Sequence, residues 1–128
     1  MDKGRVVVEV DLGKYRSVDL NLKEAEEFLS RVVDRLGYES NDVNETYRII
    51  RNFEAFYETM RKKFKDHIAP AKSMNDMIRG TVIVDRVKLY TRGDEKRIVI
   101  ILDRRVPEDV VVGALEDMGF KVEVKRPA

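Results

Sequence analysis

The sequence has no cysteine, no tryptophan and no glutamine, and it has a single histidine, His67. Without cysteine there is no disulfide, no thiol nucleophile and no cysteine-ligated zinc or iron–sulfur site. One histidine excludes any site that needs two imidazole ligands. The longest apolar run, residues 98–102, is far shorter than the ~20 residues of a membrane span, and no apolar stretch near residue 1 suits a signal peptide. We therefore expect a cytoplasmic protein with no metal, no cofactor and no membrane partner.

The charges of the chain are abundant and balanced. Among 128 residues there are 25 Lys or Arg and 24 Asp or Glu, so the net charge is +1. This balance gives no overall attraction to nucleic acid or to an anionic membrane. With 43% hydrophobic residues the chain is long enough to bury one core. Few thermolabile side chains and many ion-pair formers are typical of heat-adapted proteins, so we expect a heat-adapted organism or its virus.

The first part of the chain predicts a strand and a helix. Apolar residues alternate with mostly polar ones over residues 5–12, as in a half-buried strand. A turn at Gly13 would allow a second short strand over residues 15–20. Asn21 and Glu24 form a capping-box pattern, and apolar residues then recur at helical spacing until Gly37.

The middle of the chain predicts one long helix. Asp42 and Glu45 form another capping-box pattern, and no proline or glycine follows until Pro70. A helix of about 26 residues would be ~40 Å long, which exceeds the girth of a small domain. Its two heptad positions hold Val43, Ile50, Tyr57 and Phe64, and Thr46, Phe53, Met60 and His67. We expect this helix to project beyond its own sheet or to pair with another helix.

The last part of the chain predicts a short helix, a hairpin and a final βαβ-like ending. Ser73 and Asp76 can cap a single turn that ends at Gly80. In the strand that follows, the buried parity changes near Asp85–Arg86, which predicts a β-bulge. The remaining elements are strands over residues 81–91 and 97–103, a turn over 92–96, a helix that begins at Pro107 and ends with a Schellman motif at Gly119, and a strand over 121–125.

These elements indicate the fold class. The expected order is β-α-α-β-β-α-β in a single α+β domain over residues 1–128. It matches a ferredoxin-like split β-α-β sheet whose first crossover is enlarged by a helical insertion at about residues 41–79. Helices would cover one face of the sheet, and solvent or a partner would cover the other.

The apolar side of the long helix suggests an interface. It looks too large for a small domain to cover, and an exposed apolar patch of that size normally marks a contact with a partner. We therefore predict a non-catalytic interaction or assembly module that forms a homodimer or binds another protein. The residues expected at this interface are Ile50, Phe53, Phe56, Tyr57, Met60 and Phe64.

A basic segment supports a second hypothesis, a nucleic-acid-associated protein. The segment 61–72 has a local net charge of +4, because it has five cations and only Asp66 against them. Cations at the end of a helix also suit the helix dipole without any ligand. The expected sheet does not favour base stacking, because the strands 5–12 and 97–103 hold no aromatic residue. The candidate phosphate contacts are Arg61, Lys62, Lys63, Lys65 and Lys72.

A third hypothesis is an enzyme of the palm type. Asp11 lies at the end of the first strand, and Asp94 and Glu95 lie in the hairpin turn after Gly93. In these features the chain resembles palm-type polymerase and cyclase domains, which share this order of elements. The resemblance implies metal-dependent phosphoryl transfer with Asp11, Asp94 and Glu95 as the carboxylates. A Gly-Asp pair in a tight hairpin also occurs for turn geometry alone.

Overall fold

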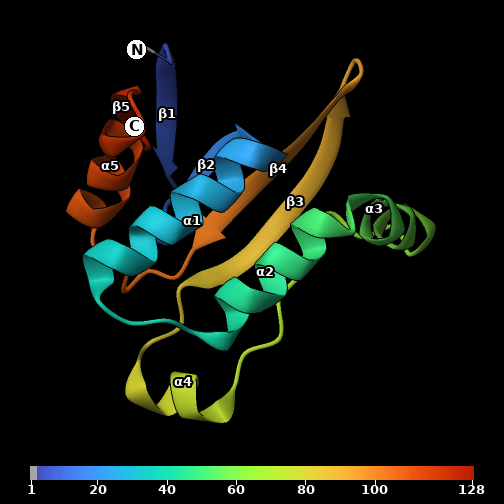
Figure 1. The fold of residues 1–128 in the computed structure, drawn as a ribbon, viewed down its shortest axis with the longest axis horizontal. Helices are drawn as coiled ribbons and strands as arrows, with labels where there is room; N and C mark the ends of the chain where they lie inside the picture. Colours follow the sequence, from blue (N-terminus) through green and yellow to red (C-terminus); the bar gives the residue numbers. More distant parts are fainter. Residues whose placement is uncertain (1–2) are drawn as a thin grey trace.

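The computed structural model describes residues 3–128 as an α+β structure with one five-stranded mixed sheet and five helices (Figure 1). The strands are β1 (Arg5–Val10), β2 (Arg16–Asn21), β3 (Val84–Arg92), β4 (Glu95–Leu102) and β5 (Lys121–Lys125). The helices are α1 (Leu22–Leu36), α2 (Asn41–Arg51), α3 (Phe53–Lys62), α4 (Met74–Arg79) and α5 (Glu108–Asp117).

The strand order across the sheet is β3-β4-β2-β1-β5. β1 and β5 are parallel, and the other three neighbouring pairs are antiparallel. The predicted bulge in β3 is confirmed, because the pairing with β4 shifts between Val84 and Arg86.

The alternative of a second short strand over residues 15–20 is confirmed, because residues 16–21 form β2. The predicted order with one strand before the helices is therefore wrong, and β2 lies between β1 and β4. The turn between β1 and β2 depends on Asp11. Its Oδ1 accepts a hydrogen bond from the Tyr15 backbone N (2.9 Å), and its backbone N donates to the Tyr15 carbonyl (3.0 Å). Aspartate favours turns because its side chain can bond the backbone of its own turn.

The prediction of one long helix is also wrong. The chain breaks at Asn52, whose φ and ψ are −123° and 39°. The Asn52 side-chain Nδ2 donates to the Arg48 carbonyl (2.8 Å), and its backbone N donates to the same carbonyl (3.1 Å). An asparagine side chain that bonds nearby backbone in this way competes with helix continuation. α3 then ends at Lys62, well before Pro70.

The break keeps both short helices on the sheet. α2 buries Val43, Ile49 and Ile50, and α3 buries Phe53 and Met60. A straight rod would carry its second half away from the sheet, so the bend buries more apolar surface than the predicted geometry.

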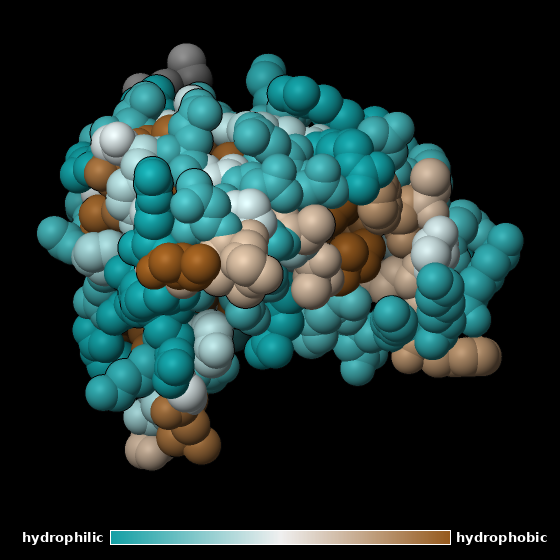
Figure 2. All heavy atoms as spheres, turned by 90° about the horizontal axis from the view of Figure 1, so that it is seen from below, coloured by the Kyte–Doolittle hydropathy of each residue, from teal (hydrophilic) through white to brown (hydrophobic). Residues whose placement is uncertain are grey.

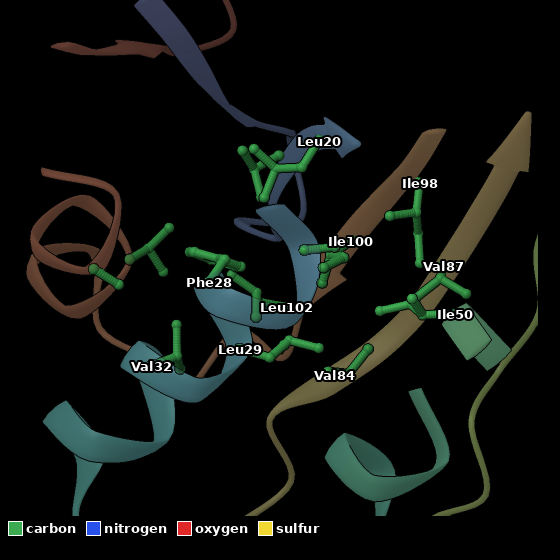
Figure 3. Close-up of a cluster of buried hydrophobic side chains, with 14 of the residues drawn as sticks. Leu20, Phe28, Leu29, Val32, Ile50, Val84, Val87, Ile98, Ile100 and Leu102 are labelled. Atoms are coloured by element: carbon green, nitrogen blue, oxygen red, sulfur yellow. The ribbon is translucent and has the colours of Figure 1, made fainter. Parts of the chain in front are cut away.

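The core lies between the sheet and the helices. Phe28, Leu29 and Val32 of α1 point toward the sheet, and Ile50 of α2 lies beside Val87 of β3 (Figure 3). In β1 the buried Val6 and Val8 alternate with the exposed Arg5, Val7 and Glu9, so the second face of the sheet is not covered by helices.

Candidate interaction surfaces

Helix α4 exposes its apolar residues. Met74, Met77 and Ile78 are 71%, 48% and 78% exposed, and none of the residues of α4 is buried. Positions i, i+3 and i+4 share one side of a helix, so the three side chains form one apolar face, which we call the α4 face. Seen from below, a patch of brown and tan spheres lies near α4 on a face that is mostly teal (Figure 2).

Polar contacts of Asp76 attach α4 to the rest of the chain. Its Oδ2 accepts from the backbone N of Asn41 (2.9 Å) and from Ser73 Oγ (2.8 Å), and its Oδ1 accepts from Thr81 Oγ1 (2.9 Å). These donors lower the pKa of the Asp76 carboxyl, the Asn41 backbone N–H most of all. A second bond joins Asn41 Nδ2 to the Ala71 carbonyl (2.9 Å). α4 is therefore held by its polar side while its apolar side faces solvent.

Half of the predicted interface residues lie in the chain's own core. Ile50, Phe53 and Met60 are buried and belong to the main apolar cluster. Phe56 and Tyr57 are partly buried against that cluster. The expectation that this set outgrows the sheet is therefore wrong, and only Phe64 of the six is fully open to solvent, at 96% exposure.

The structure divides the predicted basic segment. Four of its members lie exposed at the end of α3 and around Phe64, and these are Arg61, Lys62, Lys63 and Lys65. Lys72 lies apart from them, because its Nζ donates to the carbonyls of Asp85 (2.7 Å) and Pro70 (3.3 Å). Lys72 therefore fixes the loop before α4 and leaves the candidate set.

The end of α3 has a Schellman motif with a phenylalanine in the left-handed position. Phe64 has a φ of 52°. Its backbone N donates to the Arg61 carbonyl (3.1 Å), and the Lys65 backbone N donates to the Met60 carbonyl (3.0 Å). These two bonds define the motif, whose left-handed position is usually occupied by glycine. The sequence predicts no helix end at this point, because no glycine marks it.

The three carboxylates of the palm-type hypothesis are not brought together. Arg16 pairs with Leu102, and Asn21 pairs with Arg97, so β2 and β4 run antiparallel along their length. Asp11 precedes β2 and lies near the Leu102 end of β4, whereas Asp94 and Glu95 lie at the other end. Eight residues of strand separate these ends by roughly 25 Å. Within residues 3–128, no three His, Asp or Glu side chains gather in a group that could hold a metal ion.

Asp42 is a buried carboxylate whose role the sequence did not indicate. The predicted capping box is absent, because α2 begins after Ser40 and not after Asp42. Asp42 Oδ1 instead accepts from the backbone N of Ile83 (3.0 Å) and of Val84 (2.6 Å), which fixes the start of β3 to α2. Its Oδ2 has no hydrogen-bond partner among the described residues. Burial raises the pKa of the Asp42 carboxyl.

The open face of the sheet has polar clusters that are internally paired. Tyr90 donates to Asp19 Oδ2, and Arg97 Nε donates to Asp19 Oδ1 (2.9 Å). A shallow hollow of about 390 Å³ lies farther along this face and includes Tyr15 and Arg86. Because Asp19, Tyr90 and Arg97 bond one another, this cluster is explained by the stability of the sheet.

The comparisons with known proteins add no relative, since no family model, no curated protein and no solved structure matches the chain. In the part of the chain that the structure describes, no helix is both long enough and apolar enough to cross a membrane.

Proposed function

We propose that the protein is a non-catalytic assembly module that self-associates through the α4 face. The observation that carries this proposal is the orientation of α4, which bonds the domain through Asp76 and points Met74, Met77 and Ile78 to solvent. The predicted surface on the long helix is replaced by this one, since the chain buries Ile50, Phe53 and Met60 itself.

A second copy of the chain suits the α4 face. The face consists of two methionines and one isoleucine and carries no charge, so an identical face can meet it without like-charge repulsion. Two-fold contacts, in which the same patch is used on both subunits, are the commonest in soluble oligomers. Methionine side chains also adapt their shape to a partner.

The expected dimer is weak. A standard interface buries ~800 Å² on each partner, and three side chains of a six-residue helix provide only part of that area. Neighbouring surface must contribute the rest, so we expect dissociation in the micromolar range or above.

Light scattering over a range of protein concentrations tests the proposal. The average mass should rise from monomer toward dimer, and the double variant M77E/I78E should remain a monomer. Leu12→Glu is the matched control, since Leu12 is 86% exposed on the β1–β2 turn and lies outside the α4 face. A wild-type mass that stays monomeric up to ~1 mM, or an equal effect of the control, would contradict self-association.

The strand order supports a finer description of the fold, a variant of the ferredoxin-like split β-α-β sheet. The helical crossover connects β2 to β3, and β4 lies between these two strands. α5 then connects β4 to β5, which lies at the other edge of the sheet. β1 is the addition, since it enters between β2 and β5. An experimental structure with another strand order would contradict this proposal.

Heat adaptation is supported by ion pairs that join separate elements. Arg35 of α1 binds Asp117 of α5 through two bonds, and Arg51 of α2 binds Glu26 of α1 (2.8 Å). Such pairs matter more at high temperature, because the cost of removing charges from water falls. Thermal unfolding should give a midpoint well above the ~45–65 °C of mesophilic domains, and a midpoint inside that range would reject the proposal.

A further inference from the structure

Phe64 has a left-handed backbone conformation and an exposed ring, and no contact within the described chain accounts for a phenylalanine there. Helices α1, α4 and α5 are each followed by a glycine with positive φ, at Gly37, Gly80 and Gly119. α3 alone is followed by a phenylalanine there, with φ of 52°. A left-handed backbone strains a residue with a Cβ atom and is rare for bulky residues. The ring gains no packing in return, since Phe64 is 96% exposed.

Helix α5 provides a matched case. The Gly119 backbone N donates to the Glu116 carbonyl (2.9 Å), and the Phe120 backbone N donates to the Leu115 carbonyl (3.2 Å). This is the same pair of bonds as at the end of α3. There the left-handed residue is glycine, and the phenylalanine comes one position later and is buried. The end of α5 therefore forms this motif with glycine and without backbone strain. The end of α3 forms the same motif with phenylalanine in the left-handed position.

The cations around Phe64 are not neutralised by the chain. Lys62, Lys63 and Lys65 form no ion pair with a described residue, whereas Arg35, Arg48 and Arg51 of α1 and α2 each bind a carboxylate. Arg61 lies over the Tyr57 ring, 5.6 Å from its centre, and this contact leaves its charge in place. Asp66 is the one acidic residue between positions 61 and 66. The tip of α3 is thus a positive surface around an exposed aromatic ring.

The chain after the tip runs along β3, because Ile68 forms backbone bonds with Val87 in both directions (2.8 and 2.9 Å). The charges on this side are mixed, since Arg86 pairs with Asp85 (3.8 Å). The positive surface is therefore the tip itself.

We propose that Phe64, together with Arg61, Lys62, Lys63 and Lys65, forms a contact site for single-stranded nucleic acid. The ring would stack on an unpaired base while the cations bind the neighbouring phosphates. Both interactions are typical of proteins that bind single strands without sequence preference. A duplex offers phosphates but no free base face for a projecting ring. This site is separate from the α4 face and does not depend on it.

A lipid surface is less well matched to the tip. Lysines beside an aromatic ring also attract anionic membranes, but stable attachment needs a wide apolar side. At the tip only one ring is free, because Phe56 and Tyr57 pack against the core. One ring is sufficient for stacking on one base.

Fluorescence anisotropy with a labelled oligouridine of about 12 nucleotides tests the stacking contact. The wild-type protein should bind at about 50 mM salt, and more tightly than it binds a duplex of equal length. Phe64→Ala should weaken binding by about 5- to 150-fold, since stacking on one base has that value. Leu12→Ala removes another exposed apolar side chain and should leave the affinity unchanged.

The phosphate contacts are tested by the dependence of affinity on salt. Each phosphate contact to a single strand contributes about −0.7 to the slope of log affinity against log salt. The double variant K62E/K63E should therefore flatten the slope by about 1.4. The double variant K121E/K125E makes the same charge change on exposed lysines of β5 and should keep the wild-type slope.

Several outcomes would overturn the proposal. No anisotropy change at low salt, no loss with Phe64→Ala, or equal losses in the two lysine pairs would each contradict a site at the tip. Binding to vesicles with anionic lipid, but not to the oligouridine, would assign the tip to a membrane. Phe64→Gly should unfold at a higher temperature than the wild type, because glycine relieves the backbone strain. It should bind the oligouridine as weakly as Phe64→Ala, because the ring is absent, so a loss of binding would not be due to unfolding. The variant M77E/I78E should bind like wild type, so failure of the α4 proposal leaves this one intact.

Discussion

Helices α1 and α4 are attached to the rest of the chain in different ways. α1 buries Ala25, Phe28, Leu29 and Val32 against the sheet, and α5 adds a second apolar side. α4 buries no residue and is attached by hydrogen bonds of Asp76. α1 follows the usual rule of apolar side inward, and α4 reverses it.

The difference concerns what each region can do. Helices held by buried apolar area unfold with the whole domain, whereas elements held by a few exposed hydrogen bonds can open separately. The same reversal leaves apolar side chains free to meet a partner. The sheet with α1 and α5 is therefore the scaffold, and α4 and the exposed end of α3 present the candidate surfaces.

The largest effect is expected from removing a core ring. Phe28→Ala should lower the free energy of unfolding by about 3–5 kcal/mol, because it opens a cavity under α1. Ile78→Ala should change it by less than about 0.5 kcal/mol, since Ile78 is exposed. Denaturant unfolding of the two variants measures both values. Comparable losses of unfolding free energy in the two variants would show that Ile78 is buried, and would contradict the difference between α1 and α4.

A smaller loss is expected at Asp42, which joins α2 to the start of β3. Asp42→Ala leaves the backbone N–H groups of Ile83 and Val84 without their acceptor, and should cost about 2–4 kcal/mol. Asp42→Asn keeps an acceptor oxygen and should cost less. Denaturant unfolding compares the two variants, and an equal cost would show that the hydrogen bonds are not the cause.

The pH dependence of stability sharpens this test. Because the pKa of Asp42 is raised above its ordinary 3.8 in the folded state, its contribution is fully present below pH 3.8 and is lost as the pH rises through the raised value. Asp42→Asn should remove this decline above pH 4. Asp109→Asn, at an exposed site, should retain it. Unfolding measured between about pH 3 and 8 decides the matter.

The smallest global effect and the most local one are expected at Asp76. Asp76→Ala should speed hydrogen exchange over residues 73–81 while the global unfolding midpoint hardly moves, because α4 adds no buried side chain. The lowered pKa of Asp76 means that its contribution is present above pH 3.8 and is lost as the pH falls through the lowered value. Wild-type α4 should therefore loosen in acid. Asn75→Ala, on the same helix, should change neither property, and a global loss with Asp76→Ala would refute separate opening.

Several local features could be predicted because they depend on neighbours in the chain. The capping box of Asn21 and Glu24 is confirmed by both of its hydrogen bonds (2.8 and 3.1 Å). Ser73 caps α4 by accepting from the Asp76 backbone N (3.0 Å), and Gly80 ends that helix as expected. Short-range hydrogen bonds of this kind are visible in spacing alone.

The candidate surfaces were less accessible to prediction. The apolar heptads predict an exposed apolar side on one long helix, but a break at Asn52 turns both halves onto the sheet. Phe64 stays a predicted interface residue, and nothing in the local sequence indicates its left-handed backbone, since glycine is the usual signal. The α4 face was not singled out, because three apolar residues in one helical turn normally indicate burial.

The amino-acid sequence by itself determined the composition limits, the α+β class, most helix ends and the bulge in β3, because each of these depends on residue type or on spacing of a few residues. Only the tertiary structure decided which surfaces the apolar sides of the middle helices cover and which backbone groups the carboxylates bind. Those outcomes depend on contacts between residues far apart in the chain, such as Asp42 with Val84 and Asp76 with Asn41. The burial gained in such contacts selects one arrangement among several that the local pattern allows.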